Sequence, residues 1–287
     1  MERVTFLKNY KDDEKNRSSL NSLLQLNRGV SLETWYAQGY WQEQYIPYSF
    51  TDGTQIIANV SVYKQDVLYK GQLKSAIRLE HIILHPQYHY KHLIERLIYQ
   101  ISEEYKDKVD LIYLSADEAV IPFYPRFGFK HIEEVKHYIQ TEGIQEGIAP
   151  EIISKDEIAA TIMGCMTSYR ILGDEIQSKN DFARRCFDYM TKEEGNLYYF
   201  EQNDTYIIAR LNEDELEMID IIKEQDVALD EIVAGFKALY KFNKVKLNNK
   251  IEYKGIGKIV EEIGDNLLFV KETNIEEENL FPIIIEA

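Results

Sequence analysis

The stretch Leu79-Glu80-His81-Ile82-Ile83-Leu84-His85-Pro86-Gln87-Tyr88-His89-Tyr90-Lys91-His92-Leu93 decides the fold of this chain. Its apolar first half predicts a strand, which ends before Pro86 because proline cannot donate to a central ladder. A basic turn follows and opens a helix, in which Leu93, Leu97 and Ile101 recur at helical spacing. Strand, turn and helix are therefore contiguous.

The turn between this strand and this helix is suited to an anion. The first backbone N–H groups of a helix have no intrahelical partners and carry about half a positive charge between them. Lys91 adds a mobile cation at the same place. The sequence therefore predicts a phosphate-holding turn.

A second strand follows the helix. Residues Asp110 to Ser115 contain the strand-like run Leu-Ile-Tyr-Leu, and a short helical segment carrying Phe123 and Tyr124 comes next, closed by Gly128. Two strands joined through a helix form a crossover, so they are expected to be neighbours in one sheet.

These residues carry a family resemblance. The strand, His-Pro-x-Tyr, basic turn, helix, second strand and Phe123-Tyr124-Pro125-Arg126-Phe127-Gly128-Phe129 resemble the acyl-CoA-binding core of the Gcn5-related N-acetyltransferase (GNAT) superfamily. The run from Trp35 to Ser49 is similar to a bacterial branch whose members are about this long. The resemblance covers Met1 to roughly Tyr138 well and the remainder faintly. It implies an α/β fold with a mixed sheet.

The resemblance also implies site residues. In the superfamily the fourth strand binds pantetheine by its backbone, the turn wraps the pyrophosphate, and the Tyr of the Phe-Tyr pair protonates the thiolate. The corresponding strand residues are Ile82, Ile83 and Leu84. The corresponding turn residues are His89, Tyr90, Lys91, His92 and Leu93. Tyr124 corresponds to the acid.

Two residues of the turn depart from the family pattern. His89 stands where the family usually has Arg, and His92 stands where it has Gly. A side chain at the glycine position hinders close approach of the backbone to a phosphate, and histidine is only partly charged near neutrality. Both changes weaken the expected affinity for coenzyme A, unless the phosphate itself raises the pKa values of the histidines.

Three groups of residues have both a functional and a structural interpretation. Glu80 is a candidate general base for the acceptor amine, or a carboxylate in a salt bridge near Arg78. Tyr124 is the candidate acid or a packed aromatic residue. The aromatic residues upstream either line an acceptor pocket or pack the helices on the sheet; they are Trp35, Tyr36, Trp41 and Tyr45.

The chain is expected to hold two tandem copies of the fold. We expect a first acyl-CoA-binding domain over residues 1–140, a linker rich in Gly and charge, and a second domain over residues 151–287. Tyr48 to Ala58 aligns with Tyr199 to Ala209 at a constant offset of 151, with identities at the Tyr, the Thr and the Ile-Ile-Ala. An unrelated C-terminal piece is the alternative, because a match this short can arise by chance.

The second copy is expected to have lost its cofactor site. It repeats the order of strand, helix and strand, at Glu215–Ile222, Leu229–Tyr240 and Lys244–Leu247. The turn entering its helix, residues 223–227, has no glycine and contains two carboxylates that would repel phosphate.

Composition narrows the class of partner. The formal net charge of −16, from 33 basic and 49 acidic residues, argues against nucleic acid or an anionic membrane. Cys165 and Cys186 are too few for a disulfide framework, so a cytoplasmic location is expected. No metal site is expected from His81, His85 and the turn histidines, because no carboxylate or cysteine spacing completes a ligand set.

The resemblance therefore implies an N-acetyltransferase. It would move an acyl group from acetyl-CoA, the cosubstrate, to a small-molecule or peptide amine by direct attack, without a metal. The alternative is a catalytically degenerate member that acts as a ligand-sensing or partner-binding module. The oligomeric state stays open.

Overall fold

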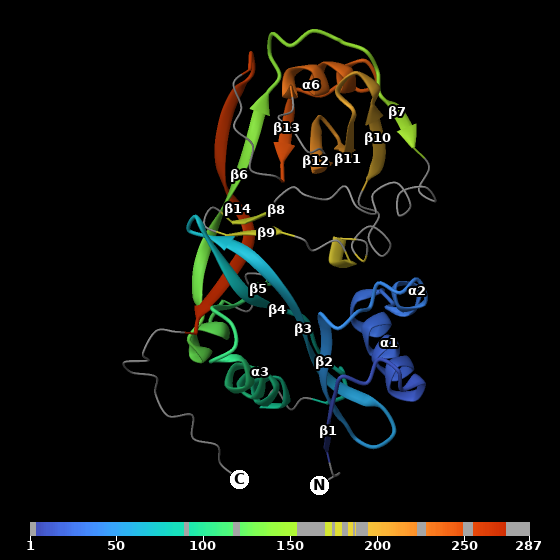
Figure 1. Ribbon diagram of the computed structural model, residues 1–287, viewed down its shortest axis with the longest axis vertical. Coiled ribbons are helices and arrows are strands. Elements are labelled where there is room, and N and C mark those ends of the chain that lie inside the picture. The colour runs from blue at the N-terminus through green and yellow to red at the C-terminus, as the bar shows by residue number, and fades with distance from the viewer. Residues whose placement is uncertain are drawn as a thin grey trace.

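One continuous mixed sheet runs through the whole computed structural model. Among the described residues it has 14 strands, most of them in the order β1-β2-β3-β4-β5-β14-β6-β13-β12-β11-β10-β7. The structure describes residues 4–88, 92–116, 121–153, 170–173, 176–179, 183–185, 187, 195–222, 228–248 and 255–273. Figure 1 shows the strands arranged as two lobes, with β6 and β14 running through both.

The lower lobe in Figure 1 is the N-terminal half. Its strands are β1 (Thr5–Lys8), β2 (Tyr45–Thr51), β3 (Ile56–Tyr69), β4 (Gln72–Leu84) and β5 (Leu111–Ala116), and its helices are α1 (Glu14–Arg28), α2 (Glu33–Ala37) and α3 (His92–Tyr105). β1 to β4 form an antiparallel meander. α3 crosses over to β5, which pairs parallel with β4, as the sequence predicted.

Local sequence explains the helix ends of this lobe. Asp13 caps α1, because its side chain accepts a hydrogen bond from the N–H of Asn16. Gly29 ends the helix in the left-handed region, at φ 68°, and its N–H bonds to the carbonyl of Gln25. α1 and α2 cover one face of the sheet and α3 covers the other (Figure 1).

The upper lobe repeats this plan. Its elements are β7 (Glu151–Ile153), β10 (Asn196–Phe200), a 3-10 turn (Glu201–Asn203), β11 (Thr205–Asn212), β12 (Glu215–Ile222), α6 (Leu229–Lys237) and β13 (Lys244–Leu247). β7, β10, β11 and β12 pair antiparallel, and β12 pairs parallel with β13. The predicted repeat is confirmed, since Tyr199 to Ala209 spans β10 and β11 just as Tyr48 to Ala58 spans β2 and β3. The turn at 223–227 lies outside the described residues.

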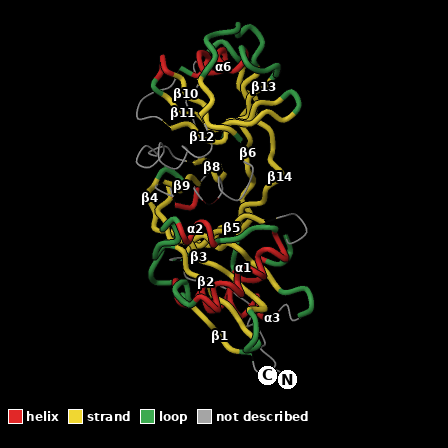
Figure 2. The backbone as a smooth tube through the Cα atoms, turned by 90° about the vertical axis from the view of Figure 1, so that its right-hand side faces the viewer, coloured by secondary structure: helices red, strands yellow, loops and turns green. Residues whose placement is uncertain are grey.

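The two copies exchange strands. β6 (Lys130–Gln140) leaves the N-terminal half and pairs with β13, while β14 (Lys258–Glu272) returns from the C-terminal half and pairs with β5. β6 and β14 also pair with each other along most of their length. Figure 2 shows them side by side between the lobes. The predicted domain boundaries at residues 140 and 151 stay a prediction. β14, which lies in the predicted second domain, pairs with β5 in the sheet of the N-terminal half.

A short hairpin completes the sheet. β8 (Arg170–Gly173) pairs with β9 (Ile176–Lys179), and β9 pairs with the far end of β3, at Asp66 to Tyr69. This part of the C-terminal half therefore also rests on the N-terminal sheet.

Candidate active site

β4 and β5 part midway along β4. Their parallel pairing covers only Ala76 to Arg78 on β4 and Leu111 to Tyr113 on β5. Beyond it, β5 continues to Ala116 against β14 alone. The edge of β4 from Leu79 to Leu84 is therefore left without a described strand on its β5 side.

A β-bulge lies on this open part of β4. The register with β3 shifts between Asn59 and Ser61, opposite His81. His81 has φ 48°, in the left-handed region that residues with a Cβ rarely adopt. The fully buried amide of Asn59 donates to the His81 carbonyl at 2.9 Å, which satisfies a group that the bulge removes from the ladder.

Strand alternation shows which backbone groups face the gap. The N–H of His85 donates to the carbonyl of Ile57 on β3 at 2.7 Å. Backbone groups alternate in direction along an antiparallel strand, so those of Leu84, opposite Ala58, point away from β3. The backbone N–H and C=O groups of Leu84 and Ile82 thus point into the gap between β4 and β5, whereas those of Ile83 point toward β3.

The predicted phosphate turn is only partly described. His89, Tyr90 and Lys91 lie outside the described residues, so their predicted roles stay predictions. His92 begins α3. Leu93 is buried in the core that α3 forms with the sheet, which leaves only its backbone to contact a ligand.

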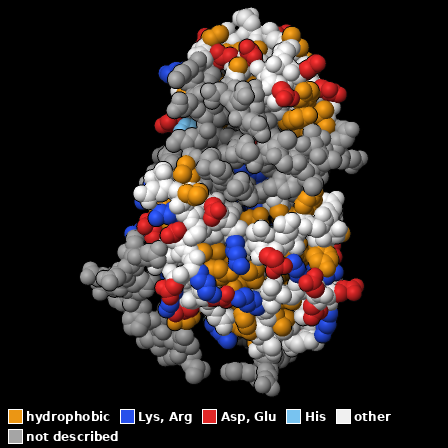
Figure 3. Space-filling model, viewed as in Figure 1, with side chains coloured by type: hydrophobic (Ala, Val, Ile, Leu, Met, Phe, Trp, Pro, Cys, Tyr) orange, Lys and Arg blue, Asp and Glu red, His pale blue; other side chains and the backbone are white. Residues whose placement is uncertain are grey.

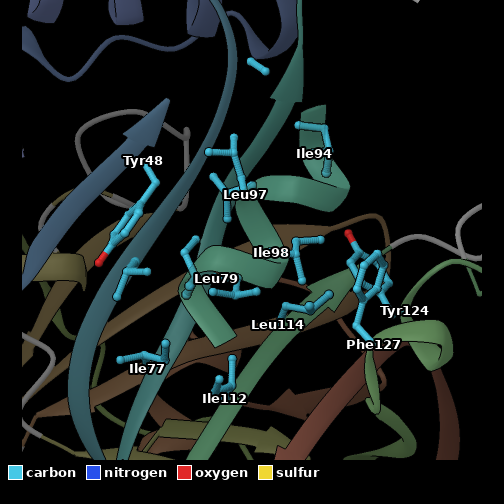
Figure 4. Packing of buried hydrophobic residues seen from close by; sticks show 14 of the residues in the cluster. Tyr48, Ile77, Leu79, Ile94, Leu97, Ile98, Ile112, Leu114, Tyr124 and Phe127 are labelled. Carbon is cyan, nitrogen blue, oxygen red and sulfur yellow. The ribbon is translucent and has the colours of Figure 1, made fainter. Parts of the chain in front are cut away.

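Tyr124 starts a short 3-10 helix (Tyr124–Phe127), as predicted, and Gly128 closes this helix at φ 83°. The Tyr124 side chain is 5% exposed and packs in the core on the α3 face. In Figure 4 its hydroxyl points away from Phe127, toward the side of α3 that carries Ile94 and Ile98. The packed and the functional interpretations of Tyr124 are thus compatible.

Glu80 lies on the opposite face in a buried ion cluster. Its Oε1 is 3.2 Å from Nε of Arg78 and accepts a hydrogen bond from Nε of Arg184. Burial raises the pKa of Glu80, but the charges of Arg184 and Arg78 outweigh it and hold the pKa below its ordinary value. A carboxylate held ionised in this way is a weak proton acceptor. The predicted salt bridge near Arg78 is present.

Arg184 belongs to a segment that the sequence did not point to. This segment, residues 183–187 without 186, lies between the two halves. Arg184 pairs with Glu80 in the N-terminal half, and Nη1 of Arg185 donates to Oδ2 of Asp220 on β12 at 2.7 Å. Arg185 and Asp220 are both buried. Two adjacent arginines thus connect the two halves of the chain.

Aromatic side chains pack over the same face of the sheet, the one covered by α1 and α2. Trp35 is 1% exposed, its Nε1 donates to the carbonyl of Ala183 at 2.6 Å, and its ring packs on Phe187. Trp41 and Tyr45 lie in the same cluster. The packing interpretation of these residues is confirmed.

A buried polar chain runs through this face of the sheet. Tyr10 and Ser49 share a hydrogen bond of 2.6 Å, and Ser49 donates to Oδ1 of Asn59 at 2.7 Å. Nδ2 of Asn59 also donates to Ser61 at 2.9 Å. The Tyr45 hydroxyl donates to Ser61 at 2.8 Å and lies 2.7 Å from Nδ1 of His81. This chain of hydrogen bonds therefore ends at His81, in the bulge of β4.

Charged side chains of both signs are mixed on the face shown in Figure 3, where Lys and Arg side chains lie among acidic ones over the N-terminal half.

Among the described residues, no helix has the length and hydropathy needed to cross a membrane.

Comparison with known proteins gives one family match and several structural matches. The family model described as an acetyltransferase (GNAT) domain matches residues 21–132. That range contains β2 to β5, α3, the bulge and Tyr124. A search of curated protein sequences found no match.

Solved structures match over nearly the whole chain. A conserved protein from Enterococcus faecalis, described as a probable N-acyltransferase, is 15% identical with a TM-score of 0.63, over 94% of this chain and 72% of its own. Eis1 from Mycobacterium abscessus is 14% identical with a TM-score of 0.60, over 96% of this chain and 74% of its own.

A third structure, a GCN5-related N-acetyltransferase from Anabaena variabilis, is 14% identical with a TM-score of 0.60, over 95% of this chain and 73% of its own. Identities this low show a shared fold. With the family match over the N-terminal half, they confirm the resemblance drawn from the sequence: residues 21–132 match a GNAT domain, and the chain shares its fold with these structures.

Proposed function

We propose that this protein transfers an acetyl group from acetyl-CoA to an amine by direct attack of the amine on the thioester. The observation that carries the proposal is the gap between β4 and β5 beside the bulge at His81. It leaves backbone groups of Ile82 and Leu84 facing an extended ligand, and the start of α3 at His92 lies just beyond. The family match over the same residues supports this function.

The chemical roles follow from the placement of the groups. Pantetheine, which is extended and carries amides, would pair with the backbone on the gap side of β4. The N-terminus of α3, with Lys91, would hold the pyrophosphate. Tyr124, on the α3 face, would protonate the departing thiolate. The acceptor is a small-molecule or peptide amine.

Direct binding tests this proposal. Acetyl-CoA is titrated into the full-length protein by calorimetry, and release of coenzyme A is followed with a panel of primary amines from benzylamine to spermidine. We expect saturable binding, and coenzyme A release that depends on the amine. Absence of binding at millimolar acetyl-CoA would overturn the proposal and favour the non-catalytic sensing or partner-binding module.

A substitution in the turn locates the ligand. His92→Glu places a negative charge at the start of α3 and should abolish binding, whereas His92→Gly should preserve or improve it. The matched control is His137→Gln, which should bind like the wild type. His137 lies on β6, with its Nδ1 3.5 Å from Oε1 of Glu261. Equal affinities for all three variants would place the ligand elsewhere.

A further inference from the structure

We propose that Asn59 is a positioning residue for acetyl-CoA: its buried amide holds His81 in the left-handed backbone conformation that forms the bulge of β4. The inference rests on the proposed acetyl transfer and deepens it, because it names the side chain that sets the affinity of the gap for the cosubstrate. Asn59 acts through the backbone of the bulge and not by contact with acetyl-CoA.

The bulge determines which backbone groups of β4 point into the gap. Between two regular residue pairs with β3, β4 has two residues, His81 and Ile82, where β3 has one, Val60. This extra residue shifts the pairing of all that follows by one position, and such a shift exchanges the backbone groups that point toward β3 with those that point away. The groups of Ile82 and Leu84 therefore face the gap only while the bulge is formed.

The bulge requires an unfavourable backbone conformation of His81. Its φ of 48° lies in the left-handed region, where the Cβ of an L-residue crowds the backbone. The other described residues besides glycine that have a positive φ lie outside the strands, whereas His81 lies inside β4; they are Asn9, Lys70, Asp204 and Glu213. The surrounding structure must therefore hold the backbone of His81 in place.

The amide of Asn59 supplies this support. Its Nδ2 donates to the carbonyl oxygen of His81 and to Oγ of Ser61, each at 2.9 Å. Its Oδ1 accepts a hydrogen bond from Ser49 at 2.7 Å, and Ser49 shares a hydrogen bond of 2.6 Å with the hydroxyl of Tyr10. Because a carbonyl oxygen can only accept, the amide nitrogen must face His81, and the hydroxyl of Ser49 fixes the amide in that orientation.

The burial of this amide makes its loss expensive for the bulge. Asn59, Ser49 and Ser61 are all fully buried, and removal of the Asn59 amide takes away its hydrogen bonds to both serines and to His81 together. The bulged backbone should then become a minor conformation. The apparent affinity of a ligand falls in proportion to the population of the conformation that binds it, so Asn59 raises the affinity for acetyl-CoA without taking part in the chemistry.

The first test separates this positioning role from a merely structural one. Acetyl-CoA is titrated into the full-length wild type and into Asn59→Ala by calorimetry, and kcat is measured as coenzyme A release at saturating acetyl-CoA. If the bulged population falls to about a tenth, the affinity of Asn59→Ala falls about tenfold, while its kcat stays near that of the wild type. A folded Asn59→Ala variant with the wild-type affinity would overturn the inference.

The matched control is Val62→Ala. Val62 is also fully buried on β3, but it pairs with Leu79, ahead of the bulge. This variant should lose stability, as measured by denaturant unfolding, and keep the wild-type affinity for acetyl-CoA. A fall in affinity as large as that of Asn59→Ala would show that any loss of packing in β3 weakens binding, and would overturn the positioning role.

The second test varies residue 81 and does not require Asn59→Ala to fold. His81→Gly and His81→Ala remove the same ring, but glycine alone adopts a positive φ without strain. His81→Gly should therefore bind acetyl-CoA more tightly than His81→Ala, by roughly five- to thirtyfold from the cost of the left-handed conformation. Equal affinities, or tighter binding by His81→Ala, would overturn the inference.

Combining the substitutions tests the link between Asn59 and His81. In the His81→Gly background the bulge needs less support, so Asn59→Ala should lower the affinity for acetyl-CoA by a smaller factor than it does in the wild type. Equal factors in the two backgrounds would show that Asn59 does not act through the backbone of residue 81, and the inference would fail.

These measurements separate the inference from the proposed function. If the wild type binds acetyl-CoA and releases coenzyme A with amines, but its affinity depends neither on Asn59 nor on the choice between glycine and alanine at residue 81, the inference fails and the proposed function stands. If the wild type does not bind acetyl-CoA, both fail.

Discussion

The ring of Phe269, on the last described strand, packs against the ring of Tyr124 with 5.2 Å between their centroids. Phe269 is fully buried in the core of the N-terminal half, yet β14 reaches that core from the C-terminal end of the described chain. The exchanged strand therefore completes the packing beneath the proposed acid.

Truncating Phe269 should destabilise the N-terminal half. Phe269→Ala is expected to lower the free energy of unfolding by about 3–5 kcal/mol, because it leaves a cavity in a core that cannot collapse around β14. Denaturant unfolding, followed by circular dichroism, measures the change. Phe6→Ala is the matched control, since Phe6 is 39% exposed and its removal should cost far less. Equal costs for both variants would show that β14 does not complete this core.

Removing the Tyr124 hydroxyl should slow transfer and leave the fold intact. Tyr124→Phe is expected to lower kcat by about 10²-fold or more, as loss of a general acid does, with unchanged affinity for acetyl-CoA. The ring packing on Phe129 and Phe269 survives the change, so stability should stay near that of the wild type. The measurements are the rate of coenzyme A release and calorimetric binding. A variant with the wild-type rate would remove the acid role.

Much of this fold follows from local sequence, and its strand exchange does not. Apolar periodicity predicted α3, β12 and β13, and the short repeat predicted the second copy. β14 has the alternation of any amphipathic strand, and nothing in it indicates that its partner is β5 and that it enters the first half. Pairing across the chain depends on the whole fold.

The same contrast holds at the candidate site. Glu80 and Arg78 are two residues apart on one strand face, so their ion pair was predictable. Arg184, which also pairs with Glu80, lies 104 residues away, and no local pattern brings them together. His81 gave no periodic signal either, because a bulge interrupts the alternation on which such a prediction depends.

Neutralising Glu80 should weaken the contact between the halves. Glu80→Gln leaves the half-buried Arg78 and the buried Arg184 without this carboxylate, and breaking a buried pair from one side costs about 3–5 kcal/mol. The double variant Glu80→Gln with Arg184→Gln should recover part of that loss, because it removes the buried charge of Arg184 together with that of Glu80. Unfolding of the single and double variants forms a double-mutant cycle. Glu43→Gln, which removes the exposed pair with Lys11, should change little.

The second half should lose stability in acid through Glu217. Burial raises the pKa of this carboxyl, but hydrogen bonds from Lys246 and Asn248 and the charge of Arg210 outweigh it and lower the pKa to about 2. A pKa below that of the unfolded chain stabilises the fold above the unfolded pKa, and this contribution is lost as the pH falls toward the folded pKa.

A variant at Glu217 tests the direction of this pH dependence of stability. Glu217→Gln should be less stable than the wild type at pH 7, on the order of 3 kcal/mol from the size of the pKa shift. The difference should shrink as the pH falls from about 5 to about 2, because the wild type then becomes protonated. Urea unfolding at a series of pH values measures both. A difference that stays constant with pH would contradict the role of ionised Glu217.

Two glycines with similar backbones allow a matched test of packing in the second copy. Gly195 has φ 101° and Gly53 has φ 97°, so alanine is strained to a similar degree at both. A Cβ at Gly195 would lie 2.5 Å from the carbonyl oxygen of Ala209, whereas a Cβ at Gly53 would meet nothing within 4 Å. Gly53→Ala should cost only the backbone strain, about 1–3 kcal/mol. Gly195→Ala should cost more, because β10 must move away from β11, and thermal unfolding of both variants compares them. Equal losses of stability in the two variants would show that β10 and β11 can move apart without a measurable loss of stability.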